Sequence, residues 1–207
     1  MFKESVEKYY PEMRAIREDL HRHPELSNQE FRTSALVMEQ LNSYGLDKVE
    51  QIAGTGVVGV LYGTADGAGQ GEGKCLAIRA DMDALPVVED TGLPFTSEKP
   101  GVMHACGHDI HTATLLTVAR VLAEHRSQFK GAVKFIFQAA EEKAPAGGAR
   151  PMCEAGVMEN PHVDAIIALH VVPSTDHAGK FGLKKGTVSS GFDLYDFDVH
   201  GKSGHGS

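Results

Sequence analysis

Residues 75–83 read Cys-Leu-Ala-Ile-Arg-Ala-Asp-Met-Asp, a short apolar run that ends in two aspartates. A run of this length, bounded by polar residues and too short for an ordinary helix, indicates a buried β-strand. Two later runs have the same form: residues 132–137 lead into two adjacent glutamates, and residues 165–169 lead into a histidine. Three predicted strands therefore each end beside acidic or imidazole side chains.

Helical patterns surround these strands. Apolar residues recur at helical spacing in four segments, which we predict to be helices: residues 2–21, 31–44, 111–123 and 149–158. Ser27 and Glu30 match a capping box, which predicts Ser27 as the N-cap of the second helix. A further apolar run bounded by glycines, residues 56–62, predicts another strand.

Continuous apolar strands that alternate with helices predict an α/β fold, a mixed and largely parallel sheet covered by helices on both faces. In such sheets, ligands bind outside the carboxyl ends of the strands. The last segment differs, because residues 192–199 alternate apolar and acidic side chains. This alternation predicts a half-exposed antiparallel strand, and the glycine-rich turn after it gives the chain the look of a cut sequence.

Composition excludes several classes of protein. The formal net charge of −8 disfavours a nucleic-acid-binding protein, which needs clustered lysines and arginines. No stretch approaches the roughly 20 apolar residues of a membrane span, and the N-terminus has no apolar core of a secretory signal. Three widely spaced cysteines do not predict a disulfide framework. We therefore expect a cytoplasmic protein with no membrane or nucleic-acid partner.

Metal-competent residues from separate segments are expected to converge on one edge of the sheet. Cys106 and His108, two residues apart in a loop before a helix, can both face one metal pair. The adjacent Glu141 and Glu142 suit a division of labour in which one carboxylate binds metal and the other accepts a proton from water. His170 ends the strand over residues 165–169. The residues predict a divalent-metal site for hydrolysis.

Each of these residues is also compatible with an ordinary structural role when taken alone. A buried cysteine is usually a small hydrophobic residue, adjacent glutamates are usually solvated, and His170 could be a core histidine. Capping at the C-terminal end of its helix is sufficient to account for His21. His104 and His111 flank the cysteine loop, and we expect them near the metals at most. The joint arrangement therefore supports the site more strongly than any single residue.

The order of the motifs resembles one enzyme group, the N-acyl amino acid amidohydrolases. This group includes aminoacylase-like enzymes, hippurate hydrolase and plant auxin-conjugate hydrolases, and it belongs to a larger set of dinuclear metallopeptidases. The likeness runs from about Leu20 to the last residue. The motifs that carry it are Leu20-His-Arg-His-Pro-Glu-Leu26, Arg79-Ala-Asp-Met-Asp-Ala-Leu-Pro86, Met103-His-Ala-Cys-Gly-His-Asp109, Phe137-Gln-Ala-Ala-Glu-Glu142 and Gly147-Gly-Ala149.

The resemblance implies a catalytic domain like that of dinuclear zinc peptidases, over residues 1–188. It also implies the start of an inserted α+β lid or dimerisation domain over residues 189–207, through which the full-length protein would form a homodimer or tetramer. Residues 201–206, Gly-Lys-Ser-Gly-His-Gly, are similar to the start of this lid. His205 is the implied candidate for holding the substrate or the developing oxyanion.

The resemblance also implies how the site works. It suggests two divalent ions per subunit, Zn²⁺ or Mn²⁺ first and Co²⁺ or Ni²⁺ as further options. Cys106 resembles the bridging ligand, with three further ligands, and Glu141 resembles the general base. The three further ligands are His108, Glu142 and His170. We expect Asp81 and Asp83 just behind these ligands, contacting them and not the metals.

The implied activity is cleavage of the amide bond in N-acyl amino acids, such as N-acetyl or N-benzoyl derivatives, by water that the metals activate. Two alternatives stay open. One is a dipeptidase or carboxypeptidase of the same fold, although Cys106 at the bridging position favours the amidohydrolases within this resemblance. The other is a metal-binding module without turnover, because the family has a further histidine ligand that this chain does not contain.

Overall fold

The computed structural model describes residues 2–67, 72–143, 147–173, 176, 178–188, 191 and 193–205. The chain divides into two compact units between Val171 and Val172, and each unit is described by itself. All helices and strands of the described residues lie in the first unit. They are α1 (Phe2–Arg22), α2 (Phe31–Ser43), β1 (Lys48–Ile52), β2 (Gly56–Tyr62), the short 3₁₀ helix η1 (Ala65–Gly67), β3 (Cys75–Asp81), α3 (His108–Glu124), the 3₁₀ helix η2 (Arg126–Gln128), β4 (Ala132–Gln138), α4 (Ala149–Glu154) and β5 (Ala165–Ala168).

The five strands form one mixed sheet in the order β1-β2-β4-β3-β5. Strand β3 pairs in parallel with both β4 and β5, whereas β2 pairs antiparallel with β4 and β1. The predicted mixed α/β sheet is confirmed, and β1 is a strand that the sequence analysis missed. In the β3–β4 register, Asp81 lies opposite Gln138. The residues that follow these two strands therefore leave the sheet at the same edge.

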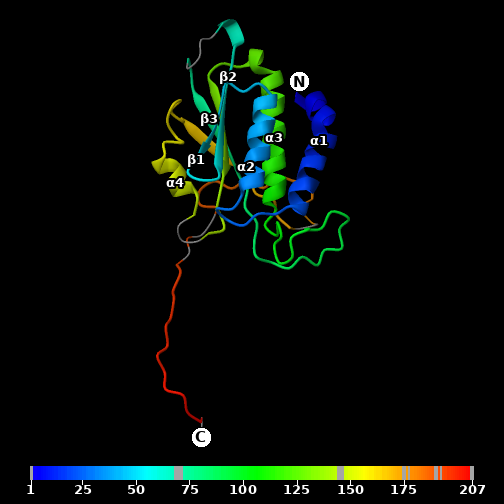
Figure 1. Ribbon diagram of the computed structural model, residues 1–207. Coiled ribbons are helices and arrows are strands. Elements are labelled where there is room, and N and C mark those ends of the chain that lie inside the picture. Colours follow the sequence, from blue (N-terminus) through cyan, green and yellow to red (C-terminus); the bar gives the residue numbers. More distant parts are fainter. Residues whose placement is uncertain are drawn as a thin grey trace. The chain divides into compact units, whose positions relative to one another are not determined.

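The two faces of the sheet carry separate apolar cores (Figure 1). Helices α1, α2 and α3 lie on one side, with α2 and α3 packed on the strands and α1 packed along α3, whereas α4 lies on the other. Strand β4 follows the two-residue period of a β-strand, because Phe135 and Phe137 join the core under α2 and α3, and Ile136 joins the core under α4. Strand β4 is thus buried on both faces, as a central strand should be.

The edge strand β5 departs from this expectation. All of its residues are exposed, and Ile166 and Ile167 keep 49% and 51% of their surface accessible. The apolar run over residues 165–169 predicts a strand covered on both faces. Strand β5 instead lies at the edge of the sheet, where its side chains stay exposed among the described residues. Helix α4 also ends at Glu154, short of the predicted residue 158, and turns follow it.

The predicted capping box of α2 is wrong. The N-cap position of α2 is Glu30, which makes no side-chain hydrogen bond to the helix end. Ser27 instead donates to Asp83, and the Glu30 carboxylate accepts the Ala140 N–H. Tertiary partners thus displace the local capping interaction, because these carboxylate and hydroxyl groups are needed to pair buried polar groups elsewhere.

The second unit contains no strand in its described residues. Residues 193–205, over which an antiparallel strand was predicted as far as residue 199, have no regular secondary structure, and Phe192 lies outside the described residues. An alternating segment forms a strand only when another strand pairs with it, and no described segment pairs with this one. The predicted division between a catalytic domain and a lid at residues 188 and 189 stays a prediction. Among the described residues, no helix combines the length and apolarity needed to cross a bilayer.

Candidate metal centre

The ends of three parallel strands and the start of α3 gather the predicted site residues of the first unit. Cys106 Sγ lies 3.4 Å from His170 Nε2. His108 Nε2 lies 3.8 Å from a Glu142 oxygen and 3.9 Å from a Glu141 oxygen. These residues form overlapping groups in which the candidate ligand atoms lie within 4.8 Å of one another. The convergence on one sheet edge that the sequence predicted is present in the structure.

His108 presents one ring nitrogen to this cluster. Its Nδ1 lies 2.9 Å from the backbone oxygen of Asp83 and 3.2 Å from the carboxylate of the same residue, so Nδ1 carries the proton and donates. The other nitrogen, Nε2, is then a lone-pair donor with no hydrogen-bond partner among the described residues, although the side chain is fully buried. A buried lone pair that faces carboxylates and finds no proton donor matches the position of a metal ligand.

Asp83 holds two of the proposed ligands in place. One of its oxygens faces His108 Nδ1, and the other accepts the Ser27 hydroxyl at 2.6 Å and the Glu142 N–H at 2.9 Å. Burial alone would raise the pKa of Asp83, but these hydrogen bonds outweigh it and hold the pKa below its ordinary value. Asp83 is therefore an ionised acceptor that contacts two of the proposed ligands, and its predicted place behind bound metals stays a prediction.

The glutamate pair sits on a strained turn. Ala140 has a φ of 52°, in the left-handed region, and its N–H donates to Glu30 Oε1 at 2.8 Å while its carbonyl accepts the Gly148 N–H. A Cβ at Gly148 would lie only 1.7 Å from the carbonyl oxygen of Ala139, so only glycine fits there. The Gly-Gly-Ala motif thus closes the turn that aims Glu141 and Glu142.

His111 and Asp81 form a second pair beside the cluster. His111 Nε2 accepts the Val171 N–H at 3.1 Å, so its Nδ1 carries the proton and lies 3.4 Å from Asp81 Oδ2. The ring also packs edge-on against His170, with centroids 4.6 Å apart. Asp81 further pairs with Arg79. His111 thus holds the backbone beside His170 through Nε2, whereas its Nδ1 faces Asp81 without a hydrogen-bond partner among the described residues.

The electrostatics of the cluster fit a divalent cation. Burial, together with the carboxylates of Glu142, Glu141 and Asp81, raises the pKa of the Cys106 thiol to about 12. Burial and the neighbouring acids Asp81 and Glu142 also raise the pKa of Glu141. Acidic groups that repel one another at a partly buried site destabilise the fold unless a cation joins them, and a bound divalent ion would lower both pKa values. The donor set, with thiolate, imidazole and carboxylate groups, suits a transition metal.

Several residues at this end of the molecule were missed or misassigned from the sequence. His21 was read as a helix cap, but it is 2% exposed and its ring bonds to Asp109 and Glu89. Glu30 was read as part of a capping box. A signal was available for His21, because it lies in the motif Leu20–Leu26 that resembles the amidohydrolases. His104 is buried, and burial lowers its pKa to about 4, so it is neutral.

His205 lies in the second unit, which is described by itself, so the structure does not test its proposed role. The roles of Cys106, His108, Glu142 and His170 as ligands, and of Glu141 as base, likewise stay predictions about a set of residues that the fold brings together.

Comparison with known proteins identifies relatives of the chain. Residues 77–204 match the model of peptidase family M20/M25/M40. The chain is 46% identical to thermostable carboxypeptidase 1 of Saccharolobus solfataricus over 194 residues, which are 93% of this chain and 47% of the relative. It is 41% identical to the N-acyl-L-amino acid amidohydrolase of Geobacillus stearothermophilus over 211 residues, which cover 100% of this chain and 54% of the relative. The chain therefore spans about half the length of the curated relatives it matches.

A solved structure shares the fold. The YXEP protein of Bacillus subtilis, described as a dinuclear metal-binding peptidase of the M20 family, superimposes with a TM-score of 0.72 at 41% sequence identity. The match covers 81% of this chain and 44% of that protein. This likeness supports the expected dinuclear-peptidase fold at the level of both sequence and backbone.

Proposed function

Because the chain belongs to peptidase family M20/M25/M40, we propose that it forms the metal-binding part of a hydrolase that cleaves the amide bond of N-acyl amino acids. The observation that carries this proposal is the fully buried His108, whose Nε2 has no hydrogen-bond partner among the described residues and faces the carboxylates of Glu141 and Glu142. Cys106 and His170 complete the cluster. Such a donor set has no evident use in folding, whereas it suits a metal centre.

Four residues would hold two divalent ions: Cys106 as the bridging ligand, with His108, Glu142 and His170. Thiolate favours Zn²⁺, whereas carboxylates also accept Mn²⁺, so the mixed set supports either ion, with Co²⁺ or Ni²⁺ as further options. When bound, the ions would polarise the scissile carbonyl and lower the pKa of the attacking water. Elemental analysis of protein purified without chelators would identify the ion.

Glu141 is the proposed proton carrier. Its side chain is 40% exposed, more than that of Glu142 at 21%, so it can reach a water or substrate in the open part of the site. Its carboxylate lies 3.9 Å from His108 Nε2, beside the proposed ligands, and stays free to accept a proton if Glu142 binds the metal. Glu141 would take the proton of the attacking water and return it to the leaving amine. His205 is the candidate for holding the substrate or the oxyanion.

The substrate class rests on the relatives. The amidohydrolase relative supports N-acyl amino acids, and the relative named a carboxypeptidase, at 46% identity, favours peptides as a second candidate. Both substrates present an amide next to a carboxylate. Parallel assays with N-acetyl and N-benzoyl amino acids and with acylated dipeptides, in the presence of Zn²⁺ or Mn²⁺, would separate the two. Metal binding without turnover by this chain would favour the metal-binding module instead.

The cytoplasmic location and the homodimer or tetramer stay predictions.

The decisive variant is Glu141→Gln. It removes the base but none of the four proposed ligands, so turnover should fall at least about 100-fold while the bound metal per chain stays the same. Glu154→Gln, an exposed glutamate in α4, is the matched control and should keep both properties. Full activity in Glu141→Gln would refute the assignment of the base, and loss of metal would make Glu141 a ligand instead.

A further inference from the structure

Helix α1 is tied to the start of α3 by a buried cluster of charges. Asp109 Oδ2 accepts a hydrogen bond from His21 Nδ1 at 2.8 Å, and Arg17 Nε lies 2.8 Å from the same oxygen in an ion pair. The Asp109 side chain has no exposed surface, and the His21 side chain is 3% exposed.

A second carboxylate completes the cluster. The other ring nitrogen of His21, Nε2, lies 3.1 Å from Glu89 Oε1, and the Glu89 side chain is 5% exposed. Both partners of His21 are carboxylates, which accept but do not donate, so the imidazole donates from both nitrogens and is charged. We call Arg17, His21, Glu89 and Asp109 the α1 clasp. Arg17 and His21 carry one positive charge each, and Glu89 and Asp109 carry one negative charge each. The net charge of the α1 clasp is therefore zero.

The α1 clasp includes a residue of the turn that carries the proposed metal ligands. Asp109 directly follows His108 in the first turn of α3, and Cys106 lies three residues before it. The N-cap of α3 is Gly107, with a φ of 81°, and no side chain caps this helix end. The contacts of Asp109 with α1 therefore anchor a turn that lacks a local cap. Asp83 holds the His108 ring separately, through its backbone and its carboxylate.

We propose that Asp109, held by His21 and Arg17, is a positioning residue that fixes Cys106 and His108 in the geometry needed to bind metal. This inference rests on the proposed function, because it assumes that these two residues are ligands. Asp109 itself is not a ligand, since its carboxylate is directed to α1. Partners behind metal ligands commonly change metal affinity 10- to 100-fold when they are removed, and we expect an effect of about this size.

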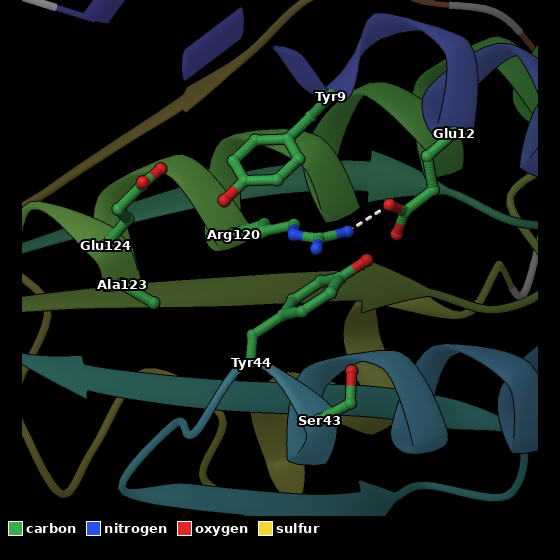
Figure 2. A pocket seen from close by; sticks show the side chains of 7 residues that line it. All are labelled: Tyr9, Glu12, Ser43, Tyr44, Arg120, Ala123 and Glu124. Carbon is green, nitrogen blue, oxygen red and sulfur yellow. Dashed lines mark hydrogen bonds and ion pairs between the residues drawn. The ribbon is translucent and has the colours of Figure 1, made fainter.

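The same two helices offer a matched control. At the other end of α3, Arg120 pairs with Glu12 of α1 and lies over the Tyr9 ring, 4.0 Å from its centroid (Figure 2). This ion pair also joins α1 to α3, but it lies about three turns of helix farther along α3, since an α-helix has about 3.6 residues per turn. Arg120→Gln should loosen the helix pair without altering the metal-binding turn.

The experiment is a Co²⁺ titration of the chain, followed by absorption spectroscopy. A cysteine thiolate bound to Co²⁺ gives a near-ultraviolet charge-transfer band, which Cys106→Ser should abolish and which reports the geometry at Cys106. We expect Asp109→Asn to weaken Co²⁺ binding about 10- to 100-fold and to change this band. Arg17→Gln, which removes only the partly exposed partner of Asp109, should weaken Co²⁺ binding less. Arg120→Gln should leave both the affinity and the band within about twofold of the unaltered chain. Circular dichroism shows which variants are folded.

The outcomes separate this proposal from the one on which it rests. If the unaltered chain gives no Co²⁺ band that depends on Cys106, the proposed metal site fails, and the positioning role fails with it. If that band is present but the folded Asp109→Asn and Arg17→Gln variants keep its affinity and shape, only the positioning role is overturned. Equal losses in Arg120→Gln and Asp109→Asn would also overturn it, because the effect would then follow helix packing in general.

Discussion

Ion pairs join helix α1 to helix α3 at the start of α3, the metal end, and near the end of α3, the far end, and the two sites differ in how deeply these pairs are buried. At the metal end, the side chains of Asp109, His21 and Glu89 are 0%, 3% and 5% exposed. At the far end, the paired side chains of Arg120 and Glu12 are 31% and 40% exposed. The far end also borders an open cavity of about 440 Å³ lined by tyrosine, serine and acidic side chains (Figure 2).

This difference decides what each contact contributes. An exposed pair is solvated in both the folded and the unfolded chain, so it adds about 0–1 kcal/mol to stability. A buried pair adds little net stability when it is complete, because its desolvation offsets the attraction. Removing one partner, however, leaves an uncompensated buried charge. The metal end is therefore the more sensitive to substitution, which is the property expected of groups that hold a site in one geometry.

The largest expected effect is the contrast between Asp109→Ala and Arg120→Ala. Loss of Asp109 leaves His21 charged and buried with one acceptor fewer, so we expect the free energy of unfolding to fall by about 3–5 kcal/mol. Loss of Arg120 removes a partly exposed pair and a contact with the Tyr9 ring, and it should cost no more than about 1–2 kcal/mol. Urea unfolding of both variants measures the difference. Equal losses would contradict the comparison between the two ends.

Most of the helices and strands were predictable from the spacing of apolar residues along the chain, because this spacing differs between helices and strands. The strands β2, β3 and β4 were predicted within one residue, since a short apolar run bounded by glycine or acidic residues is typical of a buried strand. The edge position of β5 was not predictable from its own sequence, because a run that is apolar throughout has the same pattern at an edge and in a centre. Strand β1, over Lys48–Ile52, was missed because only two of its residues are apolar.

The candidate ligands were predictable because each follows a strand or precedes a helix, and strands of one sheet end together. The residues behind them were not. Ser27 and Glu30 lie beside the helix α2 and match its local cap, yet their partners are Asp83, 56 residues away, and Ala140, 110 residues away. His21 similarly bonds to Asp109, 88 residues away. A sequence pattern shows which residues can pair locally, whereas these long-range partners depend on how α1, α2 and β4 pack.

Helix α2 also begins at the metal end, where Glu30 precedes it. Glu30 has no exposed surface, and it accepts the Ala140 N–H at 2.8 Å and the Thr55 hydroxyl at 2.5 Å. Glu30→Ala leaves both donors buried without an acceptor, so the free energy of unfolding should fall by about 1–3 kcal/mol for each group, or less if water enters. Glu39→Ala, on the exposed side of the same helix, should change it by less than about 0.5 kcal/mol. Chemical denaturation measures both, and a Glu30→Ala variant as stable as Glu39→Ala would show that the glutamate turn does not depend on α2.

The smallest expected effect is a pH dependence at the metal end that the far end lacks. The hydrogen bond to Asp109 raises the pKa of His21 above its ordinary value near 6.5, against the opposing effect of burial. A histidine whose pKa is raised by folding binds its proton more tightly in the folded chain. Its contribution to stability is therefore complete below about pH 6.5 and is lost as the pH rises through the pKa of the folded state.

The measurement is urea unfolding of the unaltered chain and of His21→Gln at several pH values from about 6 upward. The stability advantage of the unaltered chain over His21→Gln should shrink as the pH rises, because the glutamine variant has no proton to lose at this position. An advantage over His21→Gln that stays constant with pH would mean that His21 is neutral in the folded chain, and the α1 clasp would then carry an unbalanced negative charge at the metal end.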